Sequence, residues 1–138
     1  MPKLEHLERR RSAFTLVELV VVVLILGIFV AVAAPRVFDS AGDAREAGTR
    51  RSLAVVRDAI ELHRAKTGSY PPAASLAEAL RDYLKGPFPA PQAGVNQNPA
   101  VAASTQSPIT SPVSGGAGWV YNEATGQLVV NDAAYIAW

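Results

Sequence analysis

The residues of this chain with the clearest chemical potential lie at the start of a long apolar run. The run extends from Phe14 to Ala34, and Glu18 is its only charged residue. A small residue, Ala13, directly precedes the large side chain of Phe14. A charge near the centre of a membrane-spanning helix costs about 2.5–3.5 kcal/mol, and less toward an end. We therefore expect the Glu18 carboxylate to have a cationic partner or a specific purpose.

The apolar run has the length and the flanks of a membrane span. At about 1.5 Å per residue, a helix over this run is roughly 31 Å long, close to the ~30 Å hydrocarbon core of a bilayer. Arg9, Arg10 and Arg11 precede it, and Pro35 and Arg36 follow it. The positive-inside rule predicts that residues 1–13 stay in the cytoplasm and that the chain after Pro35 lies outside.

Residues Ser12–Glu18 resemble the processing and assembly segment of type IV pilins and of type II secretion pseudopilins. The basic leader, Ala13, Phe14 and Glu18 carry this resemblance, and Gly27 and Pro35 fall where the helix of that family commonly has Gly and Pro. The resemblance implies that a prepilin peptidase, a membrane aspartyl peptidase, cuts between Ala13 and Phe14. It also implies N-methylation of Phe14. The family usually has Gly before the cut, so Ala13 predicts slower or altered processing.

The same resemblance implies a role for the carboxylate. The new ammonium group of Phe14 in one subunit would lie beside Glu18 of a neighbour in a filament. Each charge then neutralises the other, which recovers much of the cost of burying them. The implied protein is a structural subunit that forms homo- or hetero-filaments with other pilins or pseudopilins. An inner-membrane platform protein and an assembly ATPase would act on it from the cytoplasmic side.

Three functions are compatible with this segment. The preferred interpretation is a type II secretion pseudopilin in the bacterial inner membrane, with its N-terminus cytoplasmic and its head periplasmic. An alternative is a minor pilin of a type IV pilus, used for adhesion, motility or DNA uptake. A further alternative is an exported soluble binding domain, because Ala31-Val32-Ala33 reads as a signal-peptide cleavage site. An ordinary signal core is about 7–15 residues and carries no carboxylate, which argues against this last alternative.

The elements that must position these residues begin with one long helix. It is predicted from Phe14 to about Lys66, with a membrane segment over 14–35 and an amphipathic continuation over 36–66. Pro35 is expected to kink or loosen it, and Gly42 or Gly48 could do so again. Apolar residues recur in the second part at helical spacing, in a stripe that also contains a histidine expected to be a packed core residue. The stripe consists of Leu53, Val56, Ile60 and His63, widened by Val55, Ala59 and Leu62.

Residues 67–138 are predicted to form a small periplasmic head. Gly68 and Pro71 end the long helix, and Ser75 with Glu78 predicts a capped helix over Leu76–Leu84. The uncharged segment 86–118 is predicted to be a loop. Its expected anchors are Phe88, Val95, Val101, Ile109 and Val113.

The end of the head has the pattern of a β-hairpin. Two strand-like runs within 118–131 flank Glu123-Ala124-Thr125-Gly126, and a third strand is predicted over Tyr135–Trp138. Trp119 and Tyr121 alternate with Val120 and Asn122, so the aromatic face is expected to pack on the long helix. The predicted fold class is α+β, a pilin-like lollipop with a long N-terminal helix and a small antiparallel β head.

Composition argues against several other functions. A net charge of +1 over 138 residues does not favour nucleic-acid binding, and the absence of cysteine excludes disulfides and thiol metal sites. Of the two histidines, His6 would leave with the leader, and no catalytic motif is present, so no enzyme is predicted. Five arginines follow the membrane segment, at positions 45, 50, 51, 57 and 64. Carboxylates at 43, 46, 58 and 61 alternate with them, which predicts i,i+4 pairs on a solvated face.

Four oxygen-bearing side chains near the hairpin are weak candidates for calcium. They are Asn122, Glu123, Asn131 and Asp132. Calcium takes six to eight oxygen ligands, and two carboxylates with two amides supply too few. Ordinary turn hydrogen bonding is therefore the preferred interpretation, and no cofactor is expected.

Overall fold

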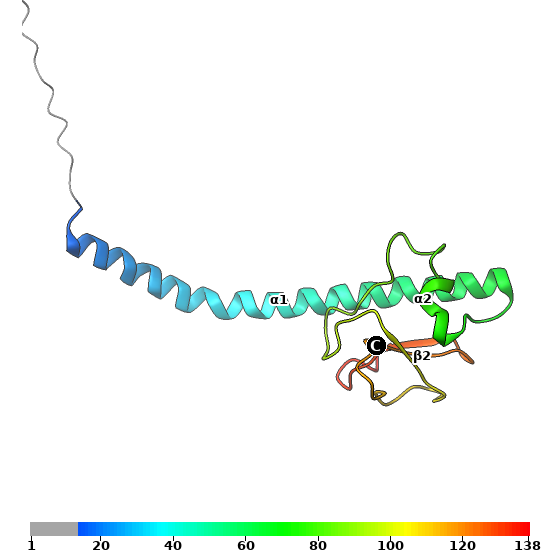
Figure 1. Cartoon of the computed structure of the whole chain (residues 1–138). Coiled ribbons are helices and arrows are strands. Elements are labelled where there is room, and N and C mark those ends of the chain that lie inside the picture. The colour runs from blue at the N-terminus through cyan, green and yellow to red at the C-terminus, as the bar shows by residue number, and fades with distance from the viewer. Residues whose placement is uncertain (1–13) are drawn as a thin grey trace, which may run out of the picture. The chain divides into compact units, whose positions relative to one another are not determined.

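The computed structural model describes residues 14–138, except for the side chains of Arg36, Phe38 and Asp39 (Figure 1). The predicted leader, with His6 and Ala13, lies outside the described residues. The chain divides into two compact units, one ending at Asp39 and the other covering Ser40–Trp138.

One helix, α1, runs over Leu16–Thr67 and contributes residues to both units. The predicted long helix is thus confirmed, within two residues at each end. Pro35 lies inside α1, and the helix assignment continues without a break through it and through both glycines that were expected to loosen it. The helix ends where Gly68 adopts a φ of 83° and donates its N–H to the Arg64 carbonyl at 2.8 Å. This left-handed conformation suits glycine because a side chain would be strained there.

The first unit presents its apolar side chains to the surroundings. The most apolar stretch of α1 has a mean hydropathy of 3.1, and none of it is buried. Phe14 is 75% exposed and Leu16 78% exposed. By length and composition, α1 is able to cross a membrane, and it is the one such helix among residues 14–138. The unit therefore needs lipid or other apolar helices around it.

The second unit contains a three-stranded sheet in the order β1-β2-β3. Strand β2, Trp119–Asn122, pairs antiparallel with β3, Gln127–Val130, and parallel with β1, Val101–Ala103. The predicted hairpin and the α+β class are confirmed. The third strand is not where it was predicted: it comes from the presumed loop 86–118, whereas Tyr135–Trp138 contains no strand.

The aromatic face of the sheet packs on α1, as predicted. Trp119 and Tyr121 are fully buried in one cluster with the helix stripe residues Leu53, Val56 and Ile60. Val120 and Val129 point to the opposite face and form a second cluster with Ile109. The alternation of side chains along β2 thus gives the head two apolar layers.

Tyr121 also joins the sheet to the segment that follows the long helix. Its hydroxyl donates a hydrogen bond to the Pro71 carbonyl at 3.1 Å. Burial, with a smaller contribution from the negative charge of Glu123, raises the pKa of Tyr121 to about 12. The phenol therefore remains a hydrogen-bond donor at physiological pH.

The edges of the helix stripe are less buried than predicted. Ala59 is buried, but Val55 is 46% exposed and Leu62 48% exposed. His63 is half-buried, and its Nδ1 lies 3.3 Å from the Ser69 carbonyl. The expected packed, hydrogen-bonded histidine is thus found at the edge of the core and not inside it, with its ring 5.8 Å from that of Tyr83.

The short helix after Pro72 differs from its prediction. A 3₁₀ turn over Ala73–Ser75 leads into α2, Leu76–Ala79, which is five residues shorter than the predicted helix Leu76–Leu84. The Ser75 side chain makes no capping hydrogen bond, so the predicted capping box is wrong. Leu76 and Leu80 are nevertheless buried in the main core, as expected. Their burial, and not the cap, holds this turn in place.

The arginines at 50 and 57 contact the C-terminal residues. Arg57 is half-buried, and its guanidinium donates to the Leu128 carbonyl at 2.8 and 3.1 Å and to the Trp138 carbonyl at 2.6 Å. Arg50 lies 4.0 Å from the centre of the Trp138 ring. Burial lowers the pKa of Arg57, but a guanidinium stays protonated in proteins. The prediction of a solvated arginine face is therefore wrong for Arg57, whereas Arg50 is exposed although it contacts the Trp138 ring.

The predicted i,i+4 pairing along this helix is also wrong. In the part of the chain that the structure describes, the ion pairs are Glu61–Arg64 at 3.9 Å and Glu78–Arg81 at 3.4 Å. Both have i,i+3 spacing, and all four side chains are more than half exposed. Such pairs contribute about 0–1 kcal/mol, so they have little influence on the fold.

Replacing Arg57 with methionine is expected to destabilise the second unit by about 1.5–3 kcal/mol. The change keeps most of the apolar stem but leaves the partly buried Leu128 and Trp138 carbonyls without a charged donor. Urea denaturation of the full chain in detergent, followed by circular dichroism, measures the effect. Arg51→Met is the matched control, because Arg51 is exposed on the same helix. Equal stability of the two variants would contradict the role given to Arg57.

The uncharged segment 86–118 is fastened mainly by polar side chains. Thr49 is fully buried on α1, and its Oγ1 accepts the N–H groups of Gln92 and Ala93 at 2.9 and 2.8 Å. The Gln92 side chain lies close against neighbouring Gly48, so a Cβ at that position would push the end of this exposed side chain aside. Four of the five predicted apolar anchors are at least partly buried, but Val95 is 87% exposed and anchors nothing.

Candidate processing and assembly site

The helix that carries the candidate site begins with a side-chain cap. Helix α1 starts at Leu16, and the preceding Thr15 accepts the Glu18 N–H on its Oγ1 at 3.2 Å. The Thr15 carbonyl accepts the Leu19 N–H, also at 3.2 Å. This is the geometry of an N-cap, in which a hydroxyl satisfies one of the free N–H groups at a helix start. Phe14 consequently lies before the helix.

Glu18 lies in the first turn of α1 and is exposed. A carboxylate is favourable there because the N-terminal end of a helix carries a partial positive charge. The two ion pairs among residues 14–138 do not include Glu18. Its carboxylate thus has both oxygen atoms available to a cation outside the described part of the chain.

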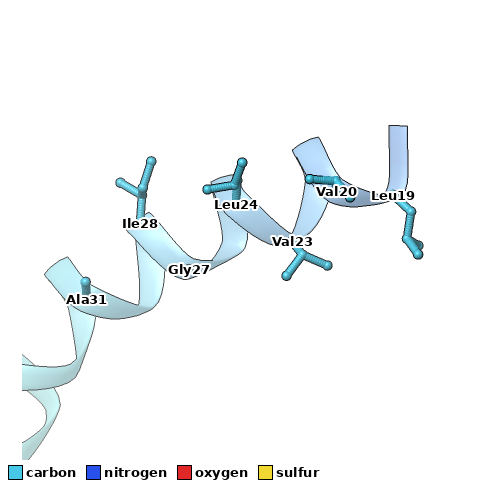
Figure 2. A pocket seen from close by; sticks show the side chains of 7 residues that line it. All are labelled: Leu19, Val20, Val23, Leu24, Gly27, Ile28 and Ala31. Carbon is cyan, nitrogen blue, oxygen red and sulfur yellow. The ribbon is translucent and has the colours of Figure 1, made fainter. Parts of the chain in front are cut away.

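A shallow apolar groove follows the same helix beyond Glu18. Figure 2 shows Leu24 and Ile28 projecting from one side of the helix, with the bare backbone of Gly27 between them. A Cβ at Gly27 would meet no atom within 4 Å, so the glycine is not required by contacts inside the chain. Small residues allow apolar helices to approach closely in membranes. The remaining residues along the groove are Leu19, Val20, Val23 and Ala31.

The structure brings some of the predicted site residues onto one helix and leaves others undescribed. Phe14, Glu18, Gly27 and Pro35 lie at the start of α1 or along it, whereas Ala13 lies outside the described residues. Thr15 was not predicted to have a role. Its signal in the sequence is the Thr-x-x-Glu pattern of a capping box directly before an apolar run.

The four calcium candidates do not form one ligand set. Asn122 pairs with Gln127 at the turn, whereas Asn131 follows the Trp119–Val130 pair at the other end of the hairpin. Their side-chain oxygens already accept backbone N–H groups. At the turn, Asn122 accepts the Ala124 N–H at 2.8 Å and Glu123 accepts the Ala73 N–H at 2.9 Å. At the other end, Asn131 accepts the Val113 N–H at 2.8 Å and Asp132 accepts the Val95 N–H at 2.9 Å. Residues 14–138 contain no cluster of three or more His, Cys, Asp or Glu side chains that could hold a metal.

Known proteins share the segment around this site. Residues 9–34 match the family model described as the prokaryotic N-terminal methylation motif. Over 84 residues, the chain is 32% identical to type II secretion system core protein G of Pseudomonas aeruginosa, covering 61% of this chain and 57% of that protein. Over 53 residues, it is 42% identical to the type IV narrow pilus major component PilA5 of Thermus thermophilus. That match covers 38% of this chain and 46% of the relative.

These matches confirm the resemblance on which the sequence interpretation was based. The chain spans about half the length of the curated relatives it matches. No solved structure matches it. The likeness includes the methylation segment, residues 9–34.

Proposed function

Since this chain carries the N-terminal methylation segment found in type IV pilins and type II secretion pseudopilins, we propose that it is a pseudopilin of a type II secretion system. In this proposal it is a structural filament subunit and not an enzyme. One observation carries the proposal. The apolar part of α1 has no cover within its unit, and its single carboxylate lies in the first turn, four residues after Phe14.

The apolar segment serves first as a membrane anchor. The chain is inserted in the bacterial inner membrane by residues 14–35, with the basic leader in the cytoplasm and the head in the periplasm. A prepilin peptidase hydrolyses the peptide bond between Ala13 and Phe14, which leaves an ammonium group on Phe14. That group is then N-methylated.

After processing, the same helix forms the filament core with other pilins or pseudopilins. The exposed apolar side chains of one subunit pack on those of its neighbours. Because Gly27 has no side chain, a neighbouring helix is able to approach closely there. The Phe14 ammonium of one subunit pairs with the available Glu18 carboxylate of the next. Because a lone charge in an apolar core is strongly unfavourable, this pair favours one register of the subunits over others. A platform protein and a cytoplasmic ATPase drive the step.

The extent of the two matches favours secretion over a pilus. Helix α1 ends at Thr67. A match over 84 residues of this chain must therefore extend past α1, so the likeness to the secretion protein includes part of the head. The match to the pilus component is shorter, at 53 residues, and covers 38% of this chain against 61% for the secretion protein. The minor pilin of a type IV pilus is thus the second candidate.

Deletion of the gene in the source bacterium distinguishes these two functions. We expect the deletion strain to retain surface pili and to accumulate folded secreted proteins in the periplasm, with secretion restored by the wild-type gene. Loss of pili with normal secretion would contradict the secretion role and favour the pilin. The readouts are electron microscopy of the cell surface and the fraction of exported protein found in the medium.

A further inference from the structure

We propose that Thr15 is a positioning residue for the processing reaction, because its cap keeps the Ala13–Phe14 peptide bond outside α1. This inference rests on the proposed function. It follows from the hydrogen bond between the Glu18 N–H and Thr15 Oγ1, which defines where the helix begins.

The cap blocks extension of the helix toward the leader. In an α-helix each N–H donates to the carbonyl four residues earlier, so a longer helix would use the Glu18 N–H to bind the Phe14 carbonyl. The Thr15 hydroxyl takes that N–H instead. The first carbonyl to accept a main-chain hydrogen bond in α1 is consequently that of Thr15, which accepts the Leu19 N–H. If the helix were two residues longer, the Ala13 carbonyl would also accept such a hydrogen bond.

A peptide bond inside a helix is a poor substrate because its carbonyl is hydrogen-bonded and the flanking backbone is coiled. The peptidase acts on the fraction of molecules in which the bond is outside the helix, so the cleavage rate scales with that fraction. The leader gives little resistance to helix extension. Residues 3–13 contain neither Gly nor Pro, and Ala13 is the strongest helix former. The cap therefore supplies the stop signal that a glycine before the cut would otherwise help to provide.

The test follows cleavage of the full chain in bacterial membranes that contain a prepilin peptidase. Thr15→Val keeps the shape of the side chain and removes the acceptor, whereas Thr15→Ser keeps the acceptor. We expect Thr15→Val to slow cleavage by at most about fivefold, the factor that corresponds to the loss of a cap of about 1 kcal/mol. Thr15→Ser should stay within about twofold of the wild type, since serine is an equally good cap. Mass spectrometry of the N-terminal peptide over time gives the cleaved fraction.

A second substitution separates a helix-boundary role from direct recognition of the threonine. Ala13→Gly disfavours helix across the cut, so it should speed cleavage of the Thr15→Val variant by a larger factor than it speeds cleavage of the wild type. An equal factor in the two backgrounds would overturn the inference. Cleavage of Thr15→Val at the wild-type rate would also overturn it and leave the proposed function standing. A wild-type chain that is not cut at all would overturn the proposed function, and this inference with it.

Discussion

Replacing Glu18 with alanine is expected to leave membrane insertion intact and to abolish incorporation of the subunit into filaments. The apolar span becomes more hydrophobic, so insertion does not suffer. In the filament, however, the Phe14 ammonium of the neighbouring subunit is left without its partner. Removing one member of a buried ion pair costs about 3–5 kcal/mol, which lowers the equilibrium constant for adding a subunit at least about 100-fold.

The geometry of α1 supports this expectation. Glu18 lies in the first turn, four residues after Phe14, and neither ion pair among residues 14–138 uses it. An internal structural role would require a partner within the described chain. The carboxylate instead faces outward from a helix whose neighbouring apolar residues are all exposed.

The measurement is the fraction of subunits recovered in sheared filaments, with membrane extraction as the control for insertion. Glu18→Gln separates charge from size and should fail like Glu18→Ala. Glu61→Ala removes a carboxylate from the second part of the same helix, where it forms an exposed pair with Arg64, and should assemble normally. Normal filament yield from Glu18→Ala would show that the proposed pair does not guide assembly.

Replacing Trp119 with alanine is expected to destabilise the second unit by about 3–5 kcal/mol. Trp119 is fully buried between the sheet and α1, and its Nε1 donates to the Pro89 carbonyl at 2.8 Å. The change leaves a large cavity in the main core and an unsatisfied carbonyl in the segment before β1. Since small domains are stable by about 5–15 kcal/mol, this is a large part of the total.

Urea denaturation of the full chain in detergent, followed by circular dichroism, measures this loss of stability. Val95→Ala is the control, because Val95 is 87% exposed and its truncation should change stability by no more than about 0.5 kcal/mol. The core assignment would be wrong if the two variants unfolded at the same urea concentration.

The elements that local patterns define were predictable from the sequence. Helix α1 follows from a continuous apolar run and then from the 3.6-residue spacing of Leu53, Val56 and Ile60. Its end follows from Gly68, whose positive φ suits no other residue as well. The hairpin follows from alternation along β2 and from the glycine at the end of its turn. In each case the determining residues are close together in the sequence.

The features that depend on distant partners were not predictable in this way. Strand β1 has three residues and no alternation, and it exists because its backbone pairs in parallel with β2, eighteen residues later. Tyr135–Trp138 has the composition of a strand, but Arg50 and Arg57 hold Trp138 against α1. The sequence predicts that Arg57, beside the apolar stripe, is solvated, because local patterns do not show that the segment ending at Trp138 packs against it.

The candidate site was chosen from residue types and spacing, and its residues are close in the sequence: Phe14 directly precedes α1, and Glu18, Gly27 and Pro35 lie on it. Thr15 was overlooked because the apolar run and its carboxylate suffice to identify the segment. The capping hydrogen bond emerges only when the first helical residue is known to be Leu16.

In the proposed function the chain matures by loss of its leader and keeps its apolar helix. Mass spectrometry of the N-terminal peptide of the mature protein, taken from the native membrane fraction, tests this maturation. We expect a peptide that begins with N-methylated Phe14. A mature chain that begins at Ala34 or Pro35 would contradict it, because the helix proposed to build the filament would have been removed.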